Sequence, residues 1–206
     1  KTCSHSIHSV TLKLTESLLK NKKFKAMTEE IIIAGFGGQG VLSMGKILAY
    51  SGIMEGKEVS WMPSYGPEMR GGTANVTVIV SDERVCSPIL NAFDTAVILN
   101  QQSLDKFEDK VKPGGVLLYD PNGITHKPTR TDIKIYTIEG AQLASDMGNT
   151  KVFNMIILGA YLKLRPIISM DKVQEGLEHS LPERAHKLIP LNMQAVEVGM
   201  NNVKEQ

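Results

Sequence analysis

The stretch that decides the fold is IIIAGFGGQGVLSMGKILAYSGIM, residues 31–54. Its β-branched start at 31–33 predicts a strand, and the glycine cluster that follows predicts a tight turn. Within 41–54 the apolar residues include the three- and four-residue spacings of a helix face. A strand, a glycine turn and a helix in this order indicate the opening of an α/β domain.

The glycine cluster, Gly35-Phe-Gly-Gly-Gln-Gly40, has the spacing GxGxxG. Glycine allows positive φ and has no Cβ to keep a ligand away, so the N–H groups of the turn and of the helix start can face an anion. We expect a phosphate or pyrophosphate group here. The alternative is that the glycines serve packing alone. In that case the polar side chain of Gln39 is simply solvated at the surface. The candidate ligand-binding residues of this cluster are Gly35, Gly37, Gly38, Gln39 and Gly40.

A second unusual stretch, Ser64-Tyr-Gly-Pro-Glu-Met-Arg-Gly-Gly72, follows a strand predicted at 59–62. It should leave the carboxyl end of that strand, at the edge where open α/β sheets bind ligands. The planar guanidinium of Arg70 suits a phosphate or a carboxylate, although a solvated pair with Glu68 is the alternative. The candidate ligand-binding residues of this stretch are Ser64, Tyr65, Arg70, Gly71 and Gly72.

A dinucleotide-binding fold also places an acid at the end of its second strand, about twenty residues after the glycines, to bind the ribose hydroxyls. Here Trp61 and Met62 occupy that place, and Glu58 lies at the wrong end of the strand. The sequence therefore disfavours NAD but not another ligand that carries phosphate.

The rest of the chain predicts alternating elements and then a run of helices. We expect strands at 73–80, 95–99, 116–119 and 133–138, and helices at 102–111, 142–147, 152–164, 171–180 and 194–203. This order predicts a Rossmann-like α/β fold, with a largely parallel sheet flanked by helices and a helical C-terminal part.

Charge divides the chain into two parts. Residues 1–26 hold six lysines and one glutamate, a net +5, so the other 180 of the 206 residues carry −4 within the total of +1. We interpret 1–26 as a basic N-terminal extension and 27–206 as the functional domain, beginning at Met27. The near-neutral total argues against a general nucleic-acid binder. No apolar run reaches about 18 residues, so we expect no membrane span.

Counting excludes several metal sites. The two cysteines, Cys3 and Cys86, are far apart and form no CxxC, so neither an iron–sulfur cluster nor a cysteine zinc site of usual spacing is expected within this chain. The five histidines form no HExxH. We expect no metal site, no catalytic residue, and a reducing cytoplasmic location.

Taken together, the two loops resemble the gamma subunit of 2-oxoacid:ferredoxin oxidoreductases, the family that includes the 2-oxoglutarate, 2-oxoisovalerate and pyruvate enzymes. The strings that carry the resemblance are Gly35-Phe-Gly-Gly-Gln-Gly-Val41 and Pro63-Ser-Tyr-Gly-Pro-Glu-Met-Arg-Gly-Gly72. Looser agreement comes from Gly148-Asn149 and from Asn154-Met-Ile-Ile-Leu-Gly159. The resemblance covers about 27–200.

The resemblance implies a subunit of an enzyme that decarboxylates a 2-oxoacid oxidatively, forms acyl-coenzyme A and passes electrons to ferredoxin. Thiamine diphosphate, magnesium and iron–sulfur clusters are implied on partner chains, namely alpha and beta subunits and often a ferredoxin-like delta subunit. This chain would contribute coenzyme A phosphate binding and assembly, and would be inactive alone. Separated from its partners, it is expected to self-associate or to expose apolar surface.

Two other functions stay open at this stage. One is an autonomous nucleotide-binding Rossmann oxidoreductase, and the other is a noncatalytic scaffold whose glycine loops bind nothing. The sequence does not choose among the 2-oxoacids and gives neither the subunit stoichiometry nor the origin of residues 1–26.

Overall fold

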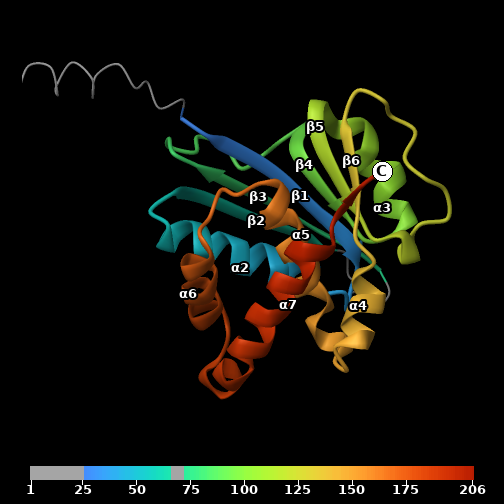
Figure 1. Cartoon of the computed structure of the whole chain (residues 1–206). Helices are drawn as coiled ribbons and strands as arrows, with labels where there is room; N and C mark the ends of the chain where they lie inside the picture. The colour runs from blue at the N-terminus through green and yellow to red at the C-terminus, as the bar shows by residue number, and fades with distance from the viewer. Residues whose placement is uncertain (1–25, 66–71) are drawn as a thin grey trace, which may run out of the picture.

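The computed structural model describes residues 26–65 and 72–206. A twisted sheet runs through the centre of the molecule and helices lie against it (Figure 1). The strands are β1 (Thr28–Phe36), β2 (Glu58–Tyr65), β3 (Thr73–Ser81), β4 (Phe93–Ile98), β5 (Val111–Tyr119), β6 (Lys134–Thr137) and β7 (Lys204–Glu205). The α-helices are α2 (Val41–Met54), α3 (Gln101–Phe107), α4 (Gly140–Asp146), α5 (Phe153–Leu164), α6 (Met170–Ser180) and α7 (Ile189–Asn202). Short 3-10 helices are η1 (Glu108–Lys110), η2 (Pro121–Gly123), η3 (Thr150–Val152) and η4 (Glu183–Leu188).

The sheet has the order β2-β3-β1-β4-β5-β6-β7. Neighbours from β1 to β6 along this order pair in parallel, whereas β3 is antiparallel to both β1 and β2, and β7 is antiparallel to β6. Strand β2 therefore runs in the same direction as β1. The prediction of a largely parallel α/β sheet is confirmed, with β3 and β7 as its two reversed strands.

The reversal of β3 follows from the length of its connection. A parallel crossover needs a dozen or more residues, usually with a helix, whereas an antiparallel return can be short. Strand β2 ends at Tyr65 and β3 begins at Thr73, so the connection is too short for a crossover. Strand β3 lies between β1 and β2, and β2 is therefore the outermost strand on that side of the sheet.

The two faces of the sheet are covered differently. Helices α2, α5, α6 and α7 lie over one face and α3 over the other (Figure 1). Strand β1 is buried on both faces: Ile31 and Ile33 pack into the larger core, and Ile32 and Ala34 into the smaller one. This explains why its sequence is a continuous apolar run rather than an alternating one.

None of the helices in the described part of the chain combines the length and the apolar character that are needed to cross a membrane.

Helix α5 is the centre of the larger core. All its residues from Met155 to Leu162 are buried, as expected for a helix that is apolar on every side. Two glycines allow α7 to cross it closely. A Cβ on Gly159 would lie 1.9 Å from the carbonyl oxygen of Val196, and one on Gly199 would lie 1.9 Å from that of Ile156. Any side chain at either glycine would force the two helices apart.

Some predicted boundaries are wrong. The helix expected at 102–111 ends at Phe107, and Val111 already belongs to β5. The last helix begins at Ile189, earlier than the predicted 194, with Pro190 in its first turn. Proline is tolerated there because the first helical N–H groups have no partner within the helix.

A buried ionic cluster joins the amino-terminal end of the sheet to the end of α5. The Glu29 side chain, which is 6% exposed, accepts a hydrogen bond from Thr95 Oγ1 at 2.5 Å, and its Oε1 lies 3.2 Å from Arg165 Nε. Arg165 also donates to the carbonyl of Asp94. Burial raises the pKa of Glu29, and the contacts with Thr95 and Arg165 offset this only in part.

This cluster gives a pH prediction for the unfolding of the isolated chain. Because the pKa of Glu29 is raised in the folded state, the folded chain binds this proton more tightly than the unfolded chain does, for which the reference value is 4.5. The protonated Glu29 therefore stabilises the fold fully below that value, and this contribution to the free energy of unfolding is lost as the pH rises through the folded pKa. The loss amounts to about 1.4 kcal/mol for each tenfold difference in proton affinity between the folded and unfolded states. Relative to Glu29→Gln, the wild type should lose free energy of unfolding between pH 4 and pH 8, as measured by urea denaturation.

Asp82 supplies a control with the opposite sign, because its contacts with Lys57 and with the backbone N–H of Met27 lower the pKa of its carboxyl group. Its contribution is present above the unfolded pKa and is lost as the pH falls through the folded one. The stability difference between wild type and Asp82→Asn should therefore grow with rising pH. Equal slopes for the two variants would contradict the account of Glu29.

Candidate functional site

The predicted glycine turn forms between β1 and α2. Strand β1 ends at Phe36 and α2 begins at Val41, with Gly40 as its N-cap at φ 76°. Gly38 has φ 102°. Both values lie in the region that residues with a Cβ rarely adopt, so the positive φ expected of these glycines is confirmed at the two positions.

The second glycine-rich stretch emerges at the same edge of the sheet, as predicted. Phe36 at the end of β1 is paired with Thr73, and Ala74 is paired with Tyr65 at the end of β2. The N–H of Gly37 donates to the carbonyl of Gly72 at 2.9 Å, which joins the two loops directly. Ser64 is exposed at the end of β2. Glu68, Arg70, Gly71 and the side chain of Tyr65 lie outside the described residues.

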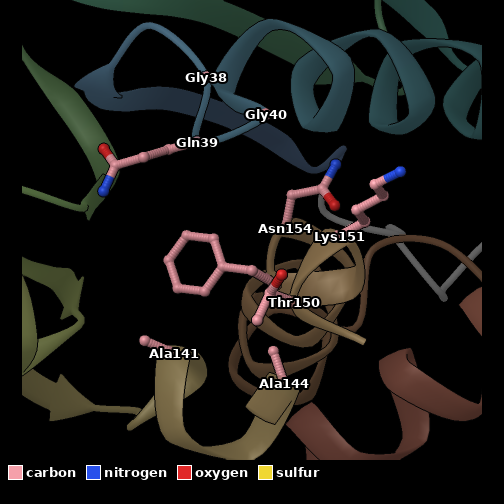
Figure 2. A pocket seen from close by; sticks show the side chains of 9 residues that line it. Gly38, Gln39, Gly40, Ala141, Ala144, Thr150, Lys151 and Asn154 are labelled. Atoms are coloured by element: carbon pink, nitrogen blue, oxygen red, sulfur yellow. The ribbon is translucent and has the colours of Figure 1, made fainter. Parts of the chain in front are cut away.

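A cavity of about 320 Å³ adjoins the first turn. Three segments distant in the sequence form it: the glycine turn, one side of α4, and the junction between η3 and α5 (Figure 2). Its lining residues are Gly38, Gln39, Gly40, Ala141, Ala144, Thr150, Lys151, Phe153 and Asn154.

The chemistry of this cavity suits an anion. Among the described residues that line it, Lys151 alone is ionisable. Within 26–65 and 72–206, the N–H groups of Gly38, Gly40 and Val41 have no hydrogen-bond partner, and the partial positive charge at the start of α2 lies beside them. The same part of the chain holds no group of three His, Cys, Asp or Glu side chains placed to bind a metal ion.

Gln39 lines the cavity, but both polar atoms of its amide are bonded to main chain. Its Oε1 accepts from the N–H of Phe36 at 2.6 Å, and its Nε2 donates to the carbonyl of Leu99 at 3.2 Å. In Figure 2 its side chain points away from Asn154 and Lys151. Both polar ends of this side chain are thus occupied by main chain, unlike the ligand-binding or solvated side chain that the sequence suggested.

Asn154 reaches the neighbouring loop rather than only the helical core. A Cβ on Gly40 would lie 2.8 Å from the Asn154 side chain, so these two lining residues of the cavity are in close contact. In the sequence Asn154 stands out only as part of the looser resemblance, and the structure shows its side chain against the glycine turn. Lys151 and Thr150 were missed, because their place beside the glycine turn depends on how α5 crosses the sheet.

Asp120 is a further residue of this region, and its role depends on contacts distant in the sequence. It follows β5, is 2% exposed, and accepts hydrogen bonds from the N–H groups of Asn122 at 2.8 Å and Ala141 at 3.1 Å. Burial raises the pKa of its carboxyl group, and these bonds oppose the rise. By holding the first turn of α4, Asp120 fixes the wall of the cavity opposite the glycine turn.

Comparison with known proteins finds a match to one family model. Residues 30–202 match the model of the pyruvate ferredoxin/flavodoxin oxidoreductase family, which is most of the chain. The chain is 37% identical over 174 residues to the ketoisovalerate oxidoreductase subunit VorA of Methanothermobacter thermautotrophicus. That match covers 84% of this chain and 36% of the relative, so the chain spans about a third of the length of that protein.

Two solved structures have similar folds. The gamma subunit of a keto/oxoacid ferredoxin oxidoreductase from Geobacter sulfurreducens has a TM-score of 0.73 and 30% identity, over 85% of this chain and 96% of that chain. The 2-oxoglutarate:ferredoxin oxidoreductase from Magnetococcus marinus, solved with 2-oxoglutarate, coenzyme A and succinyl-CoA bound, has a TM-score of 0.76 and 28% identity, over 84% of this chain and 30% of that chain.

The contact between Gly40 and Asn154 predicts a coupling that unfolding measurements can detect. Gly40→Ala should cost about 1–3 kcal/mol of stability because of its positive φ, and more because of the clash with Asn154. In an Asn154→Gly background the clash disappears, so the cost of Gly40→Ala should fall. A double-mutant cycle measured by urea denaturation gives this coupling energy.

Gly38→Ala is the matched control, because Gly38 also has positive φ but a Cβ there would meet nothing within 4 Å. The loss of stability in Gly38→Ala should come from backbone strain alone. It should therefore be the same with or without Asn154→Gly. If Gly40→Ala is equally costly in both backgrounds, the contact with Asn154 does not constrain the turn.

Proposed function

The chain belongs to the pyruvate ferredoxin/flavodoxin oxidoreductase family, and from this premise we propose that it acts as the gamma subunit of a 2-oxoacid:ferredoxin oxidoreductase. Such a complex converts a 2-oxoacid, coenzyme A and oxidised ferredoxin into acyl-coenzyme A, carbon dioxide and reduced ferredoxin. The structure of the Geobacter gamma subunit supports this role, because this chain covers 96% of it.

We place the redox cofactors on partner subunits. The chain has two cysteines, fewer than the four ligands of a usual iron–sulfur cluster. Thiamine diphosphate with magnesium would lie on alpha and beta chains, and the clusters on these or on a ferredoxin-like delta chain. The same two cysteines suit a reducing compartment, so we place the complex in the cytoplasm.

On this chain, the glycine turn and its cavity would bind the phosphates of coenzyme A. The observation that carries this proposal is the set of N–H groups at Gly38, Gly40 and Val41, which have no partner within the described residues. Gly38 and Gly40 line the cavity together with Lys151, and Val41 is the first residue of α2. Backbone N–H groups and one cation bind phosphate without any catalytic side chain. The Magnetococcus structure, which holds coenzyme A, supports the choice of ligand.

The autonomous nucleotide-binding oxidoreductase is the weaker alternative. Strand β2 ends in Pro63, Ser64 and Tyr65, with no acid for a ribose. The structure adds that the amide of Gln39 joins the ends of β1 and β4, the place that a dinucleotide would occupy. This alternative requires the isolated chain to bind NAD or NADP in calorimetry. The scaffold alternative requires it to bind neither nucleotide nor coenzyme A.

The subunit role predicts what purifies with the chain. Native affinity purification from its source should yield thiamine-diphosphate-binding chains in fixed ratio, and the assembly should reduce viologen dye with one of 2-oxoglutarate, 2-oxoisovalerate or pyruvate. Dye reduction should require both the 2-oxoacid and coenzyme A. Absence of thiamine-dependent partner chains would contradict the subunit role.

The coenzyme A role predicts which variants change the Michaelis constant. In the assembled enzyme, Lys151→Ala and Arg70→Ala should each raise KM for coenzyme A at least about tenfold, because a charged hydrogen bond to phosphate contributes about 1.5–3 kcal/mol. The KM for the 2-oxoacid should not change. Lys163→Ala on α5, outside the lining of the cavity, is the control. An unchanged KM for coenzyme A in either variant removes that residue from the proposed site.

A further inference from the structure

The strands β1 and β4 create a topological switch point. They are parallel neighbours, but the chain leaves β1 through α2 toward β2 and leaves β4 through α3 toward β5, on opposite sides. Helices α2 and α3 cover opposite faces of the sheet (Figure 1). In open α/β sheets the crevice at the carboxyl ends of two such strands is where ligands bind.

The Gln39 side chain spans this crevice. Phe36 is the last residue of β1, and Leu99 follows the last residue of β4. Gln39 accepts a hydrogen bond from the first at 2.6 Å and donates one to the second at 3.2 Å. A Cβ on Gly35 would lie 2.5 Å from Gln39 Oε1, so the side chain also fills the space that a larger residue would need.

The turn is therefore fixed from the side of the crevice, and its other side faces the cavity. Gly38 and Gly40 line the cavity together with Lys151 and Asn154, whereas the amide of Gln39 is directed away from them (Figure 2). A ligand that entered the crevice would have to displace two hydrogen bonds to main chain. A ligand bound between Gly40 and Lys151, on the side of the cavity away from the Gln39 amide, would displace neither.

We infer that Gln39 is a positioning residue: its amide holds the glycine turn so that the N–H groups of Gly38 and Gly40 face the cavity beside α4 and α5, and it closes the crevice to phosphate. The inference about affinity rests on the proposed binding of coenzyme A. The inference about the position of the turn does not, because it concerns two hydrogen bonds within this chain.

The test compares Gln39→Met with wild type in the full chain. Methionine has nearly the length of glutamine but can form neither hydrogen bond, so packing is kept while the bridge is lost. Gln174→Ala is the control, since Gln174 is exposed on α6 and, among the residues that the structure describes, its side chain bonds to Glu178 alone. Two quantities are measured below the unfolding transition: amide hydrogen exchange by NMR, and the Kd for coenzyme A by titration calorimetry.

For Gln39→Met we expect exchange of the Phe36 amide to accelerate at least tenfold while that of Ile33, in the middle of β1, is unchanged. The Kd for coenzyme A should rise at least tenfold, with no change in Gln174→Ala. A merely structural role would instead accelerate both amides together and leave the Kd of the folded variant unaltered. That result would overturn the inference, as would an unchanged Phe36 exchange rate.

The two proposals fail in different ways. If wild type binds no coenzyme A, alone or in the assembled complex, the proposed ligand is wrong, and the Phe36 exchange rate still decides whether Gln39 holds the turn. If wild type binds coenzyme A and Gln39→Met binds it equally well despite faster Phe36 exchange, the ligand stands and the positioning role is wrong.

Discussion

The close crossing of α5 and α7 is the constraint on which the rest of the structure depends. Without side chains at Gly159 and Gly199, α7 lies near enough to bury α5 against the sheet. A helix of this length spans about 18 Å, and α5 runs from the carboxyl-terminal ends of the strands toward their amino-terminal ends. Its first turn brings Asn154 to the glycine turn, and the residue after its last turn, Arg165, joins the ionic cluster at Glu29.

Much of this architecture could be predicted from local patterns. The apolar run at 31–33, the glycines that follow and the helical spacing of 41–54 each specify their own conformation, and together they place a turn with positive φ at the edge of a sheet. The edge shared by the two loops was predictable for the same reason, because it depends only on strand direction. The reversed direction of β3 can also be predicted, because its connection to β2 is short.

The rest depends on long-range packing. Nothing near Lys151 in the sequence indicates that it lies beside residues 38–40, because the crossing of α5 over the sheet decides this. The partners of Gln39 were equally hidden: a glutamine in a glycine-rich turn suggests a ligand, and only the position of Leu99, sixty residues away, shows that its donor is already used. Asp120 is a similar case, since its role at the start of α4 depends on Ala141.

Gly35 carries a consequence for how this family of sequences can change. In a dinucleotide-binding turn the first glycine is required by the turn itself, but here the space beside Gly35 is also occupied by Oε1 of Gln39. A larger residue at 35 is tolerable only if the residue at 39 becomes shorter, and a shorter residue at 39 unlinks the strand ends. A shorter residue at 39 would still not be enough, because a Cβ on Gly35 would also lie 2.9 Å from Cβ of Leu99. Evolutionary drift at position 35 is therefore limited by two residues at once, one in the turn and one at the end of β4.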